Sequence, residues 1–240
     1  MWNDDAQYTR VKLCWFEDLE ATFEACGIGA DALGFHILRG PNTNWREKAE
    51  RFRSFFEVLP PGIEKVLLID FDWETTVEAL QVAPFDSVQL YPDWPPDEIE
   101  RMKTAIGRPI RVIKVMSAQL DENEPSDAEA FLSRYADTVD AILLDSCREG
   151  GSGVTGDWNL CRRIVTSSPI PVFLAGGLSP SNVSDAIRAV RPFGVDVETG
   201  VSDRVAGRGL LKNLGKCRAF VSAVTLADRD ILQTRAGGAR

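Results

Sequence analysis

The residues of this chain best suited to chemistry are a cysteine and an aspartate that each end a short apolar run. Cys14 ends the run VKLC, and Asp145 ends the run AILLD. A carboxyl group exchanges protons readily, whereas a free thiol titrates near ~8.5 and needs help from its surroundings to act as a base. In one shared cavity the pair could perform acid–base chemistry on a small sugar. Taken alone, Cys14 could be an inert buried thiol, and Asp145 could cap the loop that follows it.

Glycine-rich turns accompany these residues and suggest a bound anion. Gly176 and Gly177 stand before Ser179-Pro180, where a helix is expected to open, and Thr199-Gly200 follows a later apolar run. Glycine lets a ligand approach backbone N–H groups, and a helix N-terminus favours negative charge. The pattern therefore predicts a phosphate-binding site, although ordinary turns with an N-cap serine would also contain these residues.

The rest of the composition excludes several kinds of chemistry. The chain has a single histidine, His36, which leaves no multi-histidine metal site and little room for a Ser-His-Asp triad. Its 5 cysteines form no C-x-x-C pair, so neither a zinc cluster nor a disulfide framework is expected. The net charge of −9 argues against nucleic acid as a partner but not against a small anionic ligand held by backbone amides.

The elements that must position these residues alternate along the chain. Eight short runs rich in Val, Ile, Leu and Phe are each followed by an amphipathic, helix-like segment, which is typical of parallel strands joined by helical crossovers. The expected strands are 11–16, 32–38, 65–70, 87–91, 111–116, 141–146, 171–176 and 194–199. The expected helices are 18–26, 45–58, 73–82, 97–106, 127–135, 157–165, 181–190 and 210–224.

This alternation predicts a closed (β/α)8 TIM barrel in a single domain. An open doubly wound sheet is the competitor, but it would favour a G-x-G-x-x-G turn after the first strand, where CWFEDLE stands. We expect residues 1–10 to form an N-terminal extension, residues 11–224 the barrel and residues 225–240 a C-terminal tail.

In such a barrel the functional face is at the carboxyl ends of the strands, and phosphate sites recur after strands seven and eight. Polar or glycine residues end most of the expected strands. They are Cys14, His36, Asp70, Tyr91, Lys114, Asp145, Gly176-Gly177 and Thr199-Gly200.

The chain offers no membrane-targeting pattern. No run of ~18 apolar residues indicates a membrane span, and the acidic start MWNDDAQYTR lacks the basic-then-apolar layout of a secretory signal. We therefore expect a cytoplasmic protein that acts as a monomer or a homodimer, with no membrane partner.

Several of these stretches resemble the phosphoribosylanthranilate isomerase family, the barrel enzymes of tryptophan biosynthesis. The resemblance covers nearly all of residues 11–224. It is carried by VKLC (11–14), GADALGF (29–35), VQL (88–90), VIK (112–114), the stretch 142–158 with its GGSGVT loop, LAGGLSPSNVSDAI (174–187) and RPFGVDVETGV (191–201).

The resemblance implies an Amadori rearrangement, in which an aminoaldose phosphate becomes an aminoketose phosphate without metal or organic cofactor. By motif, Asp145 would be the general acid that opens the ribose ring, and Cys14 the general base that removes the C2 proton. The phosphate would lie on the glycine-rich loops. Their implied contacts are Gly153, Gly176, Gly177, Thr199 and Gly200.

Departures from the family pattern gather where the amine part of the substrate would lie. Trp15 stands where glycine is common, and the loop LRGPNTNW lacks the family's arginine, for which Arg39 and Arg46 are substitutes at best. Tyr91-Pro92 replaces His-Gly, and Glu198 replaces a serine. Four residues are tentative substrate contacts under this interpretation: His36, Arg39, Tyr91 and Lys114.

Two other functions stay open at the level of sequence. One is an acid–base isomerase that acts on a different phosphosugar conjugate in specialised metabolism, since added carboxylates and a missing arginine should weaken binding of an aromatic acid. The other is a non-catalytic phosphosugar-binding relative.

Overall fold

The structure, a computed structural model, describes residues 8–40, 43–117, 126–146, 156–207 and 209–237. Strands and helices alternate through this part of the chain. The strands of the main sheet are β1 (Arg10–Leu13), β2 (Ala32–Ile37), β3 (Glu64–Ile69), β4 (Ser87–Leu90), β5 (Arg111–Ser117), β6 (Ala141–Asp145), β7 (Val172–Ala175) and β8 (Gly194–Val197).

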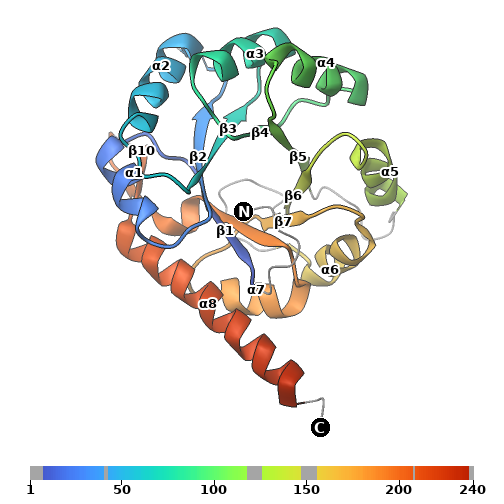
Figure 1. Cartoon of the computed structure of the whole chain (residues 1–240). Helices are drawn as coiled ribbons and strands as arrows, with labels where there is room; N and C mark the ends of the chain where they lie inside the picture. The colour runs from blue at the N-terminus through green and yellow to red at the C-terminus, as the bar shows by residue number, and fades with distance from the viewer. Residues whose placement is uncertain (1–7, 41–42, 118–125, 147–155, 208, 238–240) are drawn as a thin grey trace.

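A helix follows each strand and lies outside it, so that the helices surround the strands as a ring (Figure 1). They are α1 (Leu19–Cys26), α2 (Trp45–Phe56), α3 (Trp73–Val82), α4 (Pro96–Ile106), α5 (Ser126–Tyr135), α6 (Trp158–Ser167), α7 (Val183–Val190) and α8 (Leu214–Gly237). Side-chain caps begin several of them, such as Asp72, which accepts a hydrogen bond from the backbone N–H of Thr75 at 2.8 Å.

The strands close into a parallel barrel in the order β1 to β8. Closure comes from β8, whose residues Gly194–Val197 pair with Arg10–Leu13 of β1. The predicted (β/α)8 barrel is therefore confirmed. The open doubly wound sheet is excluded because an open sheet has two edge strands, whereas each of the eight strands here pairs with two neighbours.

Alternation along each strand sends side chains to two separate cores. One set fills the barrel interior, and the other packs between the sheet and the helices. The interior cluster contains Cys14, Ala32, Val66, Leu68, Ile113, Ala141, Leu143, Phe173 and Ala175. At the end of β1, for example, Leu13 belongs to the outer core, and Cys14, which follows it, belongs to the interior. This parity decides which strand-end residues reach the barrel mouth.

The segment after β8 differs from the expected helix 210–224. Residues 199–201 form a 3-10 turn, η1 (Thr199–Val201), and an antiparallel hairpin follows, with strands β9 (Ser202–Val205) and β10 (Gly209–Lys212). Helix α8 then begins at Leu214. The expected start at residue 210 was wrong because Gly209–Lys212 pair with β9 as a strand. The positive φ angles of Gly207 and Gly209, 74° and 76°, suit the turn between the two strands.

Helix α8 continues beyond the ring of helices (Figure 1). It extends to Gly237, across the boundary expected after residue 224, so the tail assigned to residues 225–240 is largely helical where it is described. Asp228 ties it to the start of β1 by accepting hydrogen bonds of 2.7 Å from both the backbone N–H and the hydroxyl of Thr9. No helix in the described part of the chain is long and apolar enough to cross a membrane.

Candidate active site

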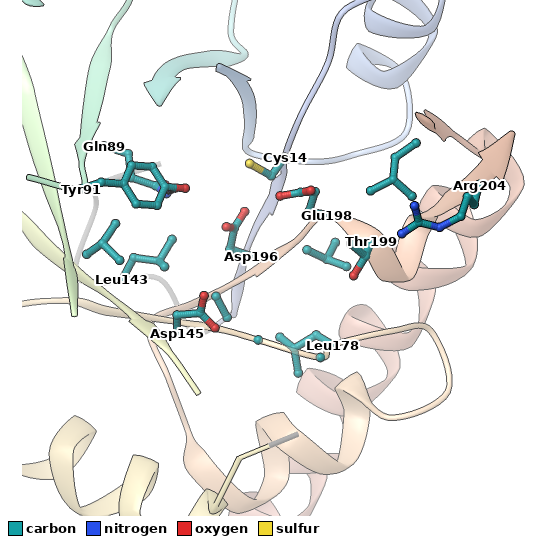
Figure 2. A pocket seen from close by; sticks show the side chains of 16 residues that line it. Cys14, Gln89, Tyr91, Leu143, Asp145, Leu178, Asp196, Glu198, Thr199 and Arg204 are labelled. Carbon is teal, nitrogen blue, oxygen red and sulfur yellow. Dashed lines mark hydrogen bonds between the residues drawn. The ribbon is translucent and has the colours of Figure 1, made fainter. Parts of the chain in front are cut away.

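A cavity of about 450 Å³ opens at the carboxyl ends of the barrel strands (Figure 2). Residues of the five barrel strands β4 to β8, residues that directly follow barrel strands, and residues of the hairpin form its wall. The lining residues are Cys14, Gln89, Tyr91, Val115, Leu143, Asp145, Ala175, Gly176, Gly177, Leu178, Asp196, Val197, Glu198, Thr199, Arg204 and Leu210.

The structure brings Cys14 and Asp145 to this one cavity (Figure 2). Cys14 follows β1 and Asp145 ends β6, so the two side chains approach from different sides of the mouth. Leu143 lines the same wall two residues before Asp145, as strand alternation requires. A small ligand in this space could therefore meet a thiol and a carboxyl group at once.

Burial makes Cys14 a weak acid. The residue is 2% exposed, and burial is the main cause that raises the pKa of its thiol to about 12. The positive charge of Lys12 acts in the opposite direction, whereas Asp196 and Glu198 raise the pKa further. At neutral pH this group is a protonated thiol before any ligand binds.

A buried ion pair lies beneath the thiol. Nζ of Lys12 is 2.8 Å from Oδ1 of Asp196, and the side chain of Lys12 is fully buried. Burial is the largest influence on the pKa of Lys12 and lowers it, but the charge of Asp196 and the hydrogen bonds and electrostatic contacts with Asp196 and Cys14 together outweigh burial and raise it. The pair thus keeps a positive charge below Cys14. Asp196 went unnoticed in the sequence, although it lies on β8 opposite Lys12 of β1.

The glycine turn after β7 lines the cavity with backbone that carries no side chains. Gly176 and Gly177 line it with φ angles of 92° and 66°, values that L-residues rarely adopt. Asn182 fixes the turn, because its side-chain amide donates to the carbonyl of Gly177 at 2.9 Å and accepts from the N–H of Ser179 at 2.8 Å. The backbone at this end of the cavity is therefore held in place without a side chain covering it.

The other residues predicted to hold a phosphate fall in different places. Thr199 lines the cavity beside the glycine turn. Gly200 lies in η1 and is not part of the cavity wall. Gly153 is outside the described residues, so its predicted role stays a prediction.

Besides Asp196, two more charged lining residues were not singled out as site residues from the sequence. Arg204 comes from β9 of the hairpin, and Glu198 follows β8. Lys212 fastens the hairpin over the cavity, since its ammonium group donates to the backbone carbonyl of Glu198 at 2.9 Å and to the hydroxyl of Ser202 at 2.8 Å. The alternating stretch SDRVAGRGLLK, with its two glycines, was the signal that could have revealed this hairpin.

Of the four tentative substrate contacts, Tyr91 alone lines the cavity. Its hydroxyl accepts a hydrogen bond of 3.0 Å from the side-chain amide of Gln89. Arg39 instead lies 3.7 Å from Asp72, and its backbone N–H donates to Asp70 at 2.7 Å, which gives these two acidic residues a local role.

Lys114 is directed away from the barrel interior. Its neighbour Val115 lines the cavity, so alternation along β5 sends Lys114 to the outer side of the sheet. There its ammonium group lies 3.3 Å from the carbonyl of Tyr91 and over the rings of Phe131 and Tyr135. Burial lowers its pKa to about 8.

His36 belongs to a closed polar cluster above β1 and β2. Its ring stacks on Trp15 with centroids 3.5 Å apart, and its Nε2 lies 3.1 Å from Oε1 of Glu17. Lys48 also pairs with Glu17 at 3.2 Å, and the guanidinium of Arg51 donates to the backbone carbonyl of Glu17. His36 is therefore occupied by protein contacts and is not on the cavity wall.

The pKa values in this cluster reflect those contacts. Burial is the main cause that lowers the pKa of His36, so the ring is neutral near pH 7. The hydrogen bond with His36 is the main cause that lowers the pKa of Glu17 to about 2, and Lys48 adds to the shift. Among the described residues, no group of three or more His, Cys, Asp or Glu side chains is arranged to hold a metal ion.

The chain matches the family model for N-(5'-phosphoribosyl)anthranilate (PRA) isomerase over residues 64–223. It is 37% identical to the N-(5'-phosphoribosyl)anthranilate isomerase of Methanocella arvoryzae over 90% of this chain and 98% of that protein.

Solved structures of such enzymes superpose on it. The phosphoribosyl anthranilate isomerase of Thermotoga maritima is similar with a TM-score of 0.72 and 28% identity, over 90% of this chain and 98% of that one. A phosphoribosyl anthranilate isomerase in complex with reduced 1-(o-carboxyphenylamino)-1-deoxyribulose 5-phosphate is similar with a TM-score of 0.70 and 27% identity, over the same shares of 90% and 98%.

Fold and cavity together define a (β/α)8-barrel protein with a thiol and carboxyl groups at the carboxyl ends of its strands. With the match over residues 64–223 and the 37% identity to a full-length relative, the chain belongs to the N-(5'-phosphoribosyl)anthranilate isomerase family.

Proposed function

We propose that this protein is an isomerase that converts N-(5-phosphoribosyl)anthranilate into the corresponding aminoketose phosphate by an Amadori rearrangement. The observation that carries the proposal is that Cys14 and Asp145, the acid–base pair expected from the family motifs, line one cavity with the Gly176-Gly177 turn. Membership of the isomerase family supports the same substrate.

In the proposed reaction Asp145 donates a proton to the ring oxygen of the ribose. The bond between C1 and that oxygen breaks as the lone pair of the amine nitrogen forms a C1=N iminium. A base then removes the proton from C2, and the resulting enol collapses to the C2 ketone with a proton on C1. Cys14 approaches the cavity from the side opposite Asp145, which suits the role of that base.

We infer that the phosphate binds at the glycine end of the cavity. Gly176 and Gly177 offer backbone N–H groups there, and Thr199 offers a hydroxyl. The guanidinium of Arg204 reaches the same end (Figure 2), and within the described part of the chain it has no hydrogen bond or ion pair. A dianionic phosphate would supply the partner that this arginine lacks.

The amine part would extend from the ribose toward Tyr91. Tyr91, Gln89 and Leu143 form a wall that is partly aromatic and partly apolar, on the other side of Asp145 from the phosphate end (Figure 2). Such a surface suits a flat aromatic ring.

We infer that neither a metal nor an organic cofactor takes part, because the rearrangement only relocates protons and bonding electrons within one molecule. We also propose a cytoplasmic role in tryptophan biosynthesis, in which the sole required partner is the phosphosugar substrate. The net charge of −9 supports the absence of nucleic acid as a partner. Whether the enzyme acts as a monomer or a homodimer is left as two alternatives.

A different amine component is the second candidate. Its support is that Arg39 is engaged with Asp70 and Asp72 outside the cavity, and that Arg204 is the one lining cation among the described residues. An aromatic carboxylate would therefore meet no second lining cation in that part of the molecule.

The deciding experiment is a fluorescence assay of phosphoribosylanthranilate consumption with purified protein, together with complementation of an isomerase-deficient tryptophan auxotroph. Turnover and growth are expected. A folded protein that supports neither would exclude the proposed substrate. Loss of activity in D145A separates an enzyme from a non-catalytic binding relative.

A further inference from the structure

Glu198 occupies a place in the cavity that suits proton transfer. It follows β8, two residues after Asp196, and therefore projects from the same face of the strand into the barrel mouth. Figure 2 shows its carboxylate directed toward the region of Cys14, with Asp145 across the cavity.

The carboxylate of Glu198 is not used by the protein itself. Lys212 and the hydroxyl of Ser202 both bind the backbone carbonyl of Glu198, at 2.9 Å and 2.7 Å, and not its side chain. Within the described part of the chain, the side-chain oxygens of Glu198 have no hydrogen bond or ion pair. They are therefore available to a ligand in the cavity.

The surroundings of Glu198 make its carboxyl group a weaker acid than an ordinary glutamate. Burial is the main cause that raises the pKa of Glu198, and the negative charges of Asp196 and Asp145 add to the effect. Lys212 of β10 and Lys12 of β1 oppose it. Among the described residues, the other charged or titratable groups that line the cavity are Arg204 of β9, the phenol of Tyr91 and the thiol of Cys14.

Cys14 is poorly matched to the same task in the unliganded protein. With a pKa of about 12, its thiol is protonated at neutral pH and offers little thiolate to act as a base. General bases work best when their pKa lies near the operating pH, and a half-buried glutamate meets that condition better than a buried thiol.

We propose that Glu198 is a second general base of this enzyme, which removes the C2 proton of the substrate beside Cys14 or in its place. The inference rests on the proposed function, since it assigns a residue to that reaction. By resemblance, the family has a serine at this position, so the assignment concerns this chain in particular.

The proton transfers balance with Glu198 in this role. The C2–H bond breaks and its electrons form a C1=C2 bond, while the electrons of the C1=N bond return to nitrogen and discharge the iminium. Glu198 holds the proton and delivers it to C1 as the enol becomes a ketone. Asp145, ionised after opening the ring, accepts the proton of the C2 hydroxyl and regains its starting state.

The test compares wild type with E198Q, E198S, C14A and the double variant C14A/E198Q, in steady-state assays with phosphoribosylanthranilate between pH 5 and 9. We expect E198Q and E198S to lower kcat about 100-fold with KM changed less than about threefold, because general-base catalysis contributes roughly 10²–10⁴. C14A should keep at least about tenfold more activity than the double variant. The acidic limb of the kcat/KM profile should persist in C14A and vanish in E198Q.

A matched control is E74Q, which alters an exposed glutamate in the first turn of α3 and should leave kcat unchanged. Thermal melting establishes that each variant is folded. The inference is overturned if E198Q and E198S keep kcat within about twofold of wild type with the acidic limb intact. Wild-type protein that fails to turn over the substrate would instead overturn the proposed function, and the role of Glu198 with it.

Discussion

The two sides of the barrel mouth use their polar groups in different ways. On the side of β6, β7 and β8, Asp145, Glu198 and the Gly176-Gly177 turn line the cavity. On the side of β1 and β2, Cys14 also reaches the cavity, but Glu17 and His36 are hydrogen-bonded within the protein. The lining residues are placed to meet a ligand, whereas the cluster of Glu17 and His36 joins two segments of the chain. Chemistry and anion binding should therefore respond to changes in the lining residues, and stability to changes in that cluster.

The largest effect should come from the carboxyl group of Asp145. D145N keeps the size of the side chain but removes its capacity to transfer a proton, so kcat/KM should fall by about 10³-fold. Steady-state kinetics with phosphoribosylanthranilate measures the loss. The matched control is D185N, which changes an exposed aspartate in the first turn of α7 and should leave activity intact. Comparable losses in both variants would show that the effect is not specific to the carboxyl group in the cavity.

The acid–base pair of the cavity could be predicted from the sequence, because strand alternation and motif position are local properties. The runs ending in Cys14 and Asp145 predicted both the strands and the cavity that these residues share. The same parity rule, applied to β5, would have excluded Lys114, since Ile113 belongs to the barrel interior and Lys114 must point outward.

Other features depend on contacts between distant segments and could not be obtained from the sequence alone. Arg204 reaches the cavity because the chain folds back as the β9–β10 hairpin, and Lys212 fastens that hairpin to the carbonyl of Glu198. His36 was a tentative substrate contact because its position at a strand end was known, but its engagement with Trp15 and Glu17 comes from tertiary packing.

The second prediction concerns Arg204 at the proposed phosphate end of the cavity. R204A should raise KM for phosphoribosylanthranilate by about tenfold with little change in kcat, because a charge-assisted contact at an open site contributes about 1.4 kcal/mol to ground-state and transition-state binding alike. The penalty should shrink as ionic strength rises, since salt screens an exposed arginine. R53A on α2, which removes an exposed arginine paired with Glu57, is the control. An unchanged KM in R204A would place the phosphate elsewhere.

The third prediction concerns the pH dependence of stability at Glu17, in the cluster with His36. The folded pKa of Glu17, about 2, lies below the ordinary value near ~4.3. Its ionised form therefore stabilises the fold above about pH 4.3, and this contribution is lost as the pH falls toward 2. The free energy of unfolding in urea, measured for wild type and E17Q between pH 7 and 3, should differ at neutral pH and converge under acid.

That difference should be modest, because the Glu17 side chain is 46% exposed and solvent screens its contacts. The difference in the free energy of unfolding measures the contacts of Glu17 with His36, Lys48 and Arg51, the groups that face it from β2 and α2. Activity should stay near the wild-type level throughout, since none of these residues lines the cavity. A gap between the two proteins that stays constant down to pH 3 would show that the carboxylate is not the source of the stabilisation.

The smallest effect should separate two opposing contributions at Trp15. This residue has a φ angle of 71°, which costs an L-residue about 1–2 kcal/mol, but its ring stacks on His36, a contact worth about 0.5–1.5 kcal/mol. W15A loses the stack and keeps the strained backbone. W15G loses the stack and relieves the strain. At most positions glycine is the less stable of the two, so here the order should be inverted, with W15G more stable than W15A by about 1 kcal/mol in urea unfolding. If W15A is instead the more stable variant, the left-handed backbone at Trp15 imposes no measurable strain. The stack on His36 would then have no strain energy to offset.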